Sequence, residues 1–246
     1  MLIAILTLFP EALEPYVGTS ILGIAQDKGL ATIRLIDFRD FTRDRHRTVD
    51  DRPFGGGPGM VLKPEPILDC VEWLERREGP FRRILLTPGG RTFTQGQARE
   101  YFREERLLIL ASRYEGFDER IREELEWDLV SIGDFVLAGG ELPALCIAEA
   151  VVRLVPGVLG HEQSAEQESF EQRSDPDAVL DHPHYTRPRV WRGREVPDVL
   201  LGGNHAAIAA WRLAQSRART RAARPDLLQR PLPTDLQAAK RRSPSD

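Results

Sequence analysis

The stretch Ser131–Pro143, reading SIGDFVLAGGELP, has the composition of a ligand-binding loop. It combines a serine, three glycines and a proline, and it lies between a short apolar run and the apolar segment Glu141–Val155. Such residues leave backbone N–H and C=O groups able to face a ligand instead of each other. The sequence therefore predicts a cofactor loop between a strand and a helix.

Two further segments with small and polar residues follow predicted strands. Thr87–Arg91 reads TPGGR, and Ala111–Gly116 reads ASRYEG. Each one alone is typical of an ordinary turn between two elements. In open α/β sheets, however, ligands bind outside the carboxyl ends of the strands. We therefore expect these two segments and the Ser131–Pro143 stretch to converge on one pocket.

A long arginine-rich segment, Asp37–Lys63, separates a predicted strand from a predicted helix. Its arginines alternate with aspartates and are followed by Gly55–Gly57 and Gly59. Loops this long in a compact domain are usually functional or disordered. One interpretation is a solvated, salt-bridged surface loop, and the other is a contact with an RNA backbone. The residues expected to contact RNA are Arg43, Arg45, His46, Arg47 and Arg52.

Charge is distributed unevenly along the chain. Residues 1–182 carry 21 Lys and Arg against 33 Asp and Glu, whereas residues 183–246 carry 13 against 5. A polyanionic partner is therefore expected to meet mainly the C-terminal part. The basic face of its predicted helix, from Ala206 to about Ala222, favours nucleic-acid contact over simple solvation. The RNA-contacting residues predicted there are His184, Arg187, His205 and Arg212.

The elements that must position these loops alternate between strands and helices. Apolar strands are predicted at Leu2–Phe9, Ala31–Ile36, Arg83–Thr87, Leu107–Ala111 and Asp128–Ile132. Helices are predicted at Glu11–Asp27, Pro64–Arg77, Thr94–Glu104, Asp118–Leu125 and Glu141–Val155. This alternation indicates an α/β fold with a parallel sheet. The last helix is apolar almost all round, so we expect it to be buried in the domain or in a subunit interface.

The bulk properties place the chain among globular proteins. Its 246 residues allow one large domain or two smaller ones. Leu2–Phe9 has no preceding basic region and is too short for a secretory signal, and no later stretch reaches membrane-spanning length. We expect a cytoplasmic protein without membrane contact. Cys70 and Cys146 are expected to be buried thiols, not a disulfide.

Three regions are predicted along the chain. Residues 1–160 form the α/β domain, the polar and acidic residues 161–182 form a flexible linker, and residues 183–246 form a helical domain. The tail after about residue 233 is expected to be partly disordered.

Several common motifs are absent. The sequence has no glycine fingerprint of dinucleotide-binding folds after its first strand, no Walker A motif and no nucleophile elbow. His182 and His184 flank a proline without nearby cysteine or a zinc-binding helix, so no metal site is expected there.

Six segments together resemble one known family. They are RDFTRDRHRTVDDRPFGGGPGM (39–60), SRYEGFDER (112–120), SIGDFVLAGGELPA (131–144), PGVLGHE (156–162), PHYTRP (183–188) and GNHAAIAAWR (203–212). In this order they are similar to the bacterial tRNA (guanine-N1)-methyltransferases of the SPOUT class. The resemblance covers the chain to about Leu228.

The resemblance implies a fold and an activity. The α/β domain would contain a deep trefoil knot and would be followed by a small all-α domain. The knot loops would bind S-adenosylmethionine, and the enzyme would be an obligate homodimer with its site at the interface. The substrate would be the guanosine at position 37 of tRNA, beside the anticodon, when another guanosine precedes it.

The resemblance also assigns roles to residues. The implied cofactor-binding residues are Leu86, Thr87, Pro88, Gly90, Ser112, Arg113, Tyr114, Glu115, Gly116, Ser131, Ile132, Gly133, Asp134, Phe135, Val136, Leu137, Gly139, Gly140 and Pro143. Glu115 would pair with the methionine ammonium of the cofactor. Arg153 would engage the target nucleotide.

The chain departs from the family at the general base. The family has an aspartate directly before a Ser-Phe pair, whereas Glu168 precedes Ser169-Phe170 here. We assign Glu168 as the base, with Glu166, Asp175 and Asp177 as alternatives. Two other functions stay open: a SPOUT enzyme that methylates a ribose 2′-hydroxyl, and a non-catalytic RNA-binding homodimer.

Overall fold

The chain divides into two compact units, Met1–Glu162 and Gln163–Asp246. This computed structural model describes residues 1–160, 168–170 and 179–229. The predicted end of the first domain, residue 160, lies close to the division. Most of the predicted linker and the whole predicted tail fall outside the described residues.

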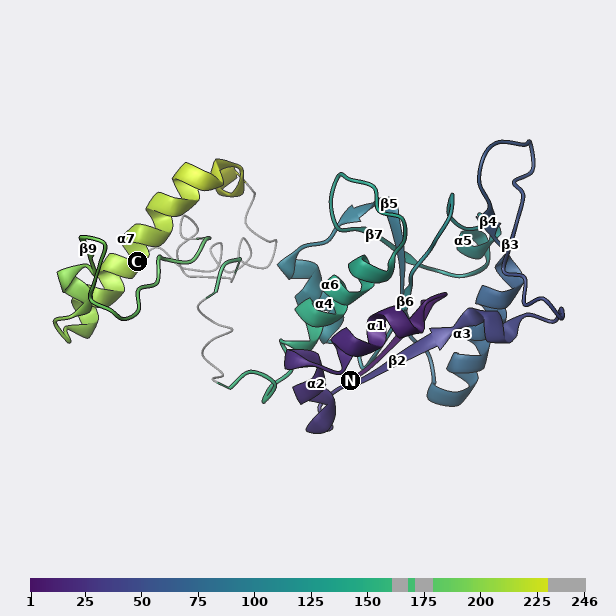
Figure 1. Ribbon diagram of the computed structural model, residues 1–246, viewed down its shortest axis with the longest axis horizontal. Helices are drawn as coiled ribbons and strands as arrows, with labels where there is room; N and C mark the ends of the chain where they lie inside the picture. The colour runs from purple at the N-terminus through teal and green to yellow at the C-terminus, as the bar shows by residue number, and fades with distance from the viewer. Residues whose placement is uncertain (161–167, 171–178, 230–246) are drawn as a thin grey trace, which may run out of the picture. The chain divides into compact units, whose positions relative to one another are not determined.

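The first unit is built on a parallel sheet (Figure 1). Its strands are β1 (Leu2–Thr7), β2 (Thr32–Asp37), β5 (Arg82–Thr92), β6 (Arg106–Leu110) and β7 (Asp128–Ser131). They lie in the order β2-β1-β6-β5-β7, and every neighbouring pair is parallel. The α/β fold with a parallel sheet is therefore confirmed.

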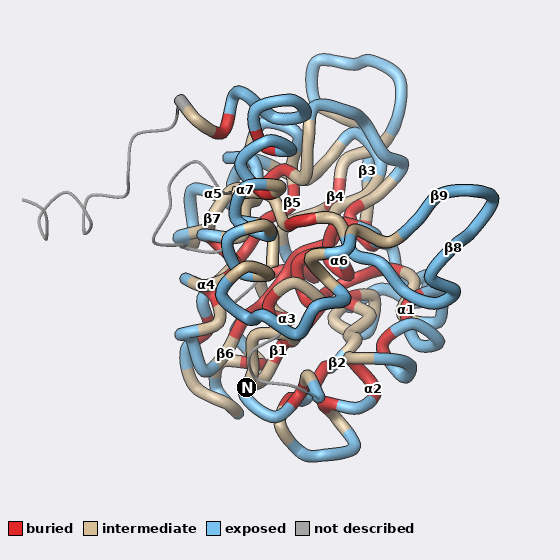
Figure 2. The backbone as a smooth tube through the Cα atoms, turned by 90° about the vertical axis from the view of Figure 1, so that its left-hand side faces the viewer, coloured by how far each residue is buried: buried red, intermediate tan, exposed pale blue. Residues whose placement is uncertain are grey.

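Helices cover both faces of this sheet (Figure 1). One face packs against α1 (Pro10–Val17), α2 (Ser20–Asp27), α4 (Gln95–Phe102) and α6 (Glu141–Val152). The other packs against α3 (Pro64–Glu78) and α5 (Arg120–Glu124). Each face of the sheet thus has its own hydrophobic core, the first with α1, α2, α4 and α6 and the second with α3 and α5. Alternate residues of β1 contribute to both, because Ile3 and Ile5 belong to the first core and Ala4 and Leu6 belong to the second. Buried backbone accordingly concentrates along the central strands (Figure 2).

The predicted helix Glu11–Asp27 is in fact two helices. Thr19 has an extended backbone, with φ −124° and ψ 166°, which ends one helix and begins the next. The turn is tight, since a Cβ on Gly23 would lie 2.6 Å from the carbonyl oxygen of Gly18. Sequence periodicity did not show this break because both pieces bury apolar residues in the same core.

The segment Asp37–Lys63 is more ordered than a simple loop. It contains the 3-10 helix η1 (Phe38–Phe41) and an antiparallel pair, β3 (Asp50–Asp51) and β4 (Val61–Leu62). Buried Phe38, Val49 and Leu62 attach it to the second core. Most of its exposed residues therefore lie in two turns, around residues 43–48 and 52–59.

The predicted loop Thr87–Arg91 lies inside β5 as an irregularity of the strand. Leu86 and Arg91 both pair with Val130 of β7, so residues 87–90 leave the ladder and return to it. Such an excursion re-aims side chains at the edge of a sheet.

The second unit contains one long helix, α7 (His205–Ala223), with the 3-10 turns η3 (Asp198–Leu200) and η4 (Pro225–Gln229). The Oδ1 atom of Asn204 accepts a hydrogen bond from the N–H of Ala207 at 3.1 Å, as expected of an N-cap. The unit is not all-α, because β8 (Val190–Trp191) and β9 (Arg194–Glu195) form a small exposed hairpin (Figure 2). A two-residue ladder of this kind leaves too little periodicity for sequence-based prediction.

Parts of the predicted linker are attached to α7. The N–H of Leu180 donates to Thr220 Oγ1 at 3.0 Å, and the hydroxyl of Ser216 donates to the carbonyl of Leu180. The N–H of Asp181 donates to Ser169 Oγ at 2.9 Å. The described linker residues therefore pack within the second unit.

The two thiols differ. Cys70 is buried as predicted, but Cys146 is exposed, so the prediction of a buried thiol is wrong there. Cys146 lies one helical turn from exposed Leu142 on the outer side of α6. In the described ranges, no helix is both long and apolar enough to cross a membrane.

Candidate ligand-binding site at the carboxyl edge of the sheet

A cavity of about 270 Å³ lies at the carboxyl ends of β6 and β7, beside the point where β5 leaves its ladder with β7. The three predicted loops meet there. It is lined by Leu86, Thr87, Pro88, Ser112, Arg113, Tyr114, Glu115, Gly116, Val130, Ser131, Ile132, Gly133, Phe135, Val136, Leu137, Ala138, Gly139, Gly140 and Pro143. Sequence reasoning missed Val130 and Ala138, which carry no recognisable ligand-binding chemistry.

Two of the predicted cofactor residues do not line the cavity. Asp134 is exposed to solvent. Gly90 faces the backbone of β7, because a Cβ on it would lie 2.4 Å from the nitrogen of Val130. Gly90 thus allows the close approach of the β5 excursion to its neighbouring strand.

Hydrogen bonds join the loops into one rim. The N–H of Gly140 donates to the carbonyl of Ser112 at 2.8 Å, and Arg113 and Gly139 form an antiparallel bridge. The hydroxyl of Ser112 donates to the carbonyl of Leu86 at 3.0 Å. Ser112 therefore connects the end of β6 with the start of the β5 excursion, a role for its side chain that the sequence did not reveal.

A buried carboxylate holds the base of the rim. Glu141, at the start of α6, is buried and accepts hydrogen bonds from Arg113 Nε at 3.0 Å and from Thr7 Oγ1 at 3.1 Å. The guanidinium of Arg113 also lies over the ring of Phe9, 4.4 Å from its centroid. These contacts hold the Arg113 side chain against Glu141 and Phe9. Sequence reasoning missed Thr7, Phe9 and Glu141 because their partners are distant in the chain.

The arginine- and glycine-rich segment reaches this site. The N–H of Glu115 donates to the carbonyl of Met60 at 3.1 Å, and the N–H of Leu62 donates to the carbonyl of Gly116 at 3.0 Å. Gly59 leaves room for Glu115, since a Cβ on Gly59 would lie 2.4 Å from Glu115 Cγ. The segment 59–62 thus supports the loop that presents Glu115.

Tyr114, beside Glu115, is held as a neutral phenol. Burial raises the pKa of Tyr114, and the carboxylate of Asp50 raises it further through charge and a hydrogen bond. The hydrogen bond joins the Tyr114 hydroxyl, at the rim of the cavity, to the carboxylate of Asp50.

Several apolar side chains at or next to the cavity are exposed to solvent. Val136 is 84% exposed and Leu142 is 62% exposed, and Phe135 and Leu137 are exposed beside them. On the same side of α6, the hydroxyl of Tyr16 hydrogen-bonds to Glu149, which raises the pKa of Tyr16. Several large apolar side chains exposed on neighbouring segments are typical of an interaction site.

Neither predicted catalytic residue is among the residues that line the cavity. Arg153 ends α6, whereas the cavity touches the beginning of that helix at Gly140 and Pro143. At a rise of 1.5 Å per residue, ten residues separate Arg153 from Pro143 by about 15 Å along the helix. Glu168 belongs to the second unit. The alternatives Glu166, Asp175 and Asp177 lie outside the described residues.

The predicted RNA-contacting residues are all exposed, but several are engaged in ion pairs. Arg43 pairs with Asp69 at 2.9 Å, and Arg47 pairs with Asp40 and Asp37. His184 contacts Asp181 at 2.9 Å. The salt-bridged interpretation of the arginine-rich segment is therefore partly correct, while Arg45, His46, Arg52, Arg187, His205 and Arg212 stay candidates for RNA contact.

The fold and the cavity define an α/β protein with a cavity at the carboxyl edge of a parallel sheet, which is where such folds bind small ligands. Over residues 1–230, the chain matches the family model described as tRNA (Guanine-1)-methyltransferase TrmD, and it belongs to that family. This confirms the resemblance carried by the six sequence segments.

Relatives agree with this assignment. The tRNA (guanine-N(1)-)-methyltransferase of Bacillus licheniformis is 53% identical over 230 residues, which cover 93% of each chain. The protein of the same name from Dehalococcoides mccartyi (strain ATCC BAA-2266) is 51% identical over 231 residues, covering 94% of this chain and 91% of the relative. That of Bacillus subtilis (strain 168) is 52% identical over 229 residues, covering 93% and 92%.

Proposed function

We propose that this protein transfers the methyl group of S-adenosylmethionine to N1 of the guanosine at position 37 of tRNA, when a guanosine precedes it. The observation that carries the proposal is the family match over residues 1–230. The convergence of three loops on one cavity supports it, because the family implies a cofactor pocket made of these loops.

The residues of the cavity fit this cofactor. Leu86, Ile132 and Leu137 offer apolar walls for an adenine ring, and backbone groups of the glycine-containing loops can read its edge. The carboxylate of Glu115 can pair with the methionine ammonium. When bound, the cofactor supplies an activated methyl group on a sulfonium, so the protein must mainly position the attacking nitrogen.

The nucleophile needs a base. Guanine N1 carries a proton, and a carboxylate beside it can remove that proton while positive charge near O6 stabilises the developing anion. We assign the first role to Glu168 and the second to Arg153. The target base must leave the anticodon-loop stack, and unpaired loop bases are the ones that proteins read most readily.

We further propose that the enzyme is a homodimer with a composite site. An arginine side chain cannot bridge about 15 Å along α6 to reach the cavity of its own chain. A second copy packed against the exposed apolar surface at Val136 and Leu142 would bring another Arg153 to the cavity. Family membership supports a SPOUT-type trefoil knot in the first unit, and the tRNA substrate supports action in the cytoplasm.

The decisive experiment for the reaction maps the methylated atom. Purified enzyme, S-adenosylmethionine and a tRNA transcript with G36 and G37 are incubated, and the RNA is digested to nucleosides for mass spectrometry. The proposal predicts a methyl group on the guanine base at N1. A methyl group on a ribose would indicate the 2′-hydroxyl enzyme instead, and RNA binding without transfer would indicate the non-catalytic alternative.

A further inference from the structure

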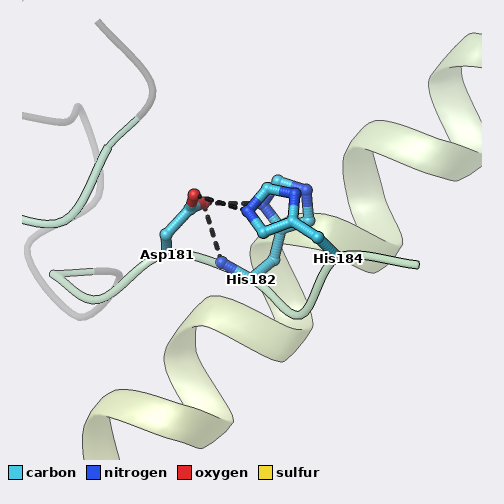
Figure 3. A group of neighbouring side chains, drawn as sticks. All are labelled: Asp181, His182 and His184. Carbon is cyan, nitrogen blue, oxygen red and sulfur yellow. Dashed lines mark hydrogen bonds and ion pairs between the residues drawn. The ribbon is translucent and has the colours of Figure 1, made fainter. Parts of the chain in front are cut away.

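A cluster of metal-ligating side chains lies in the second unit, outside the proposed active site. It consists of Asp181, His182 and His184, which come from four consecutive residues (Figure 3). One ligand atom from each side chain lies within 4.8 Å of the others. The two histidines alone predicted no metal site, whereas the fold brings the carboxylate of Asp181 into contact with both rings.

The three side chains face one another. Asp181 Oδ1 lies 2.7 Å from His182 Nδ1, and Asp181 Oδ2 lies 2.9 Å from His184 Nε2. The two imidazole rings are tilted, with centroids 4.5 Å apart. The dashed contacts in Figure 3 show both rings directed at the same carboxylate. Two imidazole nitrogens and a carboxylate oxygen thus converge on one small volume.

The backbone of this cluster is held in place before any ligand arrives. The N–H of Asp181 donates to Ser169, its carbonyl accepts from Arg219 Nη1 at 3.2 Å, and the preceding residue is bonded to α7 through Thr220. Such support reduces the ordering cost of ligand binding.

The cluster is also open on one side. His182 is only 8% exposed, whereas the side chain of His184 is 70% exposed. A ligand could therefore enter from solvent at His184 and be anchored by the buried His182. Nearby positive charge from Arg212 and Arg219 would weaken the binding of a cation without removing any ligand.

We propose that Asp181, His182 and His184 bind one divalent transition-metal ion of the zinc type. Two imidazoles and one carboxylate are ligands that suit Zn²⁺ and Co²⁺, whereas Mg²⁺ and Ca²⁺ prefer oxygen ligands. Three protein ligands leave at least one coordination position for water. In this proposal His184 binds the metal ion, whereas the sequence predicted that it contacts RNA directly.

The experiment uses the full-length protein without a polyhistidine tag. Zn²⁺ binding is followed by calorimetry, and Co²⁺ binding is followed by visible absorption, with Mg²⁺ in excess. We expect one ion per chain that Mg²⁺ does not displace. His184→Asn and Asp181→Asn should each weaken binding by at least about tenfold, because a neutral amide replaces an imidazole or a carboxylate ligand.

His205→Asn is the matched control, since His205 is an exposed histidine of the same unit. It should leave the metal affinity unchanged. Because His184 is exposed, its replacement should leave the unfolding transition of the metal-free protein unchanged. Absence of stoichiometric binding, or equal affinity in the wild type and His184→Asn, would overturn the proposal.

Discussion

At the scale of single residues, Glu168 carries the proposed proton transfer. Glutamate has the acid–base chemistry of aspartate with one additional methylene. The turn that contains it is attached to the second unit, since the hydroxyl of Ser169 accepts from Asp181 and the N–H of Phe170 donates to Val179. Contacts within the second unit therefore help to position the proposed base.

Glu168→Gln should abolish methyl transfer while S-adenosylmethionine still binds. General-base catalysis contributes about 10²–10⁴-fold, so single-turnover rates should fall by that order. Cofactor affinity, measured by calorimetry, should stay unchanged. Glu123→Gln, which alters an exposed carboxylate of α5, should leave both quantities unaltered. Near-normal turnover of Glu168→Gln would remove Glu168 from the role of base.

Gly140 allows two loops to touch at the cavity. A Cβ there would lie 2.8 Å from Ala111 Cα and 3.0 Å from the nitrogen of Ser112. Gly140→Ala should therefore lower the free energy of unfolding by about 1–3 kcal/mol, as overpacking does, and should weaken cofactor binding. Gly160→Ala, where a Cβ would meet nothing within 4 Å, should change stability by less than about 0.5 kcal/mol in the same denaturant titration. Equal stability of the two variants would contradict this explanation.

At the scale of elements, α6 combines two environments that its sequence could not separate. Its apolar residues predicted burial in a domain or in a subunit interface, and the helix has both a buried side and an exposed apolar side. Ala144, Ile147, Ala148 and Val151 pack in the first core, whereas Leu142 and Cys146 face outward. An unpartnered apolar side on a helix that also borders the cavity supports the composite site.

Leu142→Asp should convert the proposed dimer to a monomer. A carboxylate on this surface would be desolvated without a partner if a second copy packed there. We expect sedimentation to show a monomer and methyl transfer to be lost, while circular dichroism stays that of the wild type. Val190→Asp, on the exposed β8, should stay dimeric. A Leu142→Asp protein that stays dimeric and active would contradict the interface.

Thiol alkylation gives a second readout of the same surface. Burial raises the pKa of Cys70 to about 12, so Cys70 should not react in the native protein at neutral pH. Cys146 is exposed on the single chain, although partial burial and Glu149 raise its pKa as well. Cys146 should therefore be protected in the wild-type dimer and should react slowly in Leu142→Asp. Equal alkylation rates of Cys146 in the two proteins would argue against coverage of α6.

Local composition was sufficient to predict the parallel sheet and the loops around the cavity. Apolar runs mark strands, and small polar residues after them mark the ligand edge. It could not predict the contacts that fix the site. Glu141 lies 134 residues from its partner Thr7 and 28 residues from Arg113, so only the folded chain brings them together. The β5 excursion escaped prediction for the same reason, because it depends on pairing with Val130.

At the scale of the whole molecule, the basic C-terminal part is the proposed tRNA-binding surface. Each phosphate contact releases a counterion. It therefore makes the slope of the logarithm of tRNA affinity against the logarithm of salt concentration steeper by about 0.9. We expect a steep salt dependence of tRNA affinity, and Arg212→Ala should reduce the slope by about 1. Arg224→Ala is the control, because the guanidinium of Arg224 already forms two hydrogen bonds with Asp226 at 2.9 and 2.8 Å. A flat salt response would contradict the assignment.

The proposed activity of the whole molecule is methylation of the guanosine beside the anticodon. Transfer of a labelled methyl group from S-adenosylmethionine is measured on paired transcripts of one tRNA that differ only at positions 36 and 37. We expect up to one methyl group per transcript with G36 and G37. We expect no transfer to the transcript with adenosine at position 37, and strongly reduced transfer when position 36 is changed. Equal labelling of the G37 and A37 transcripts, or no labelling of either, would contradict it.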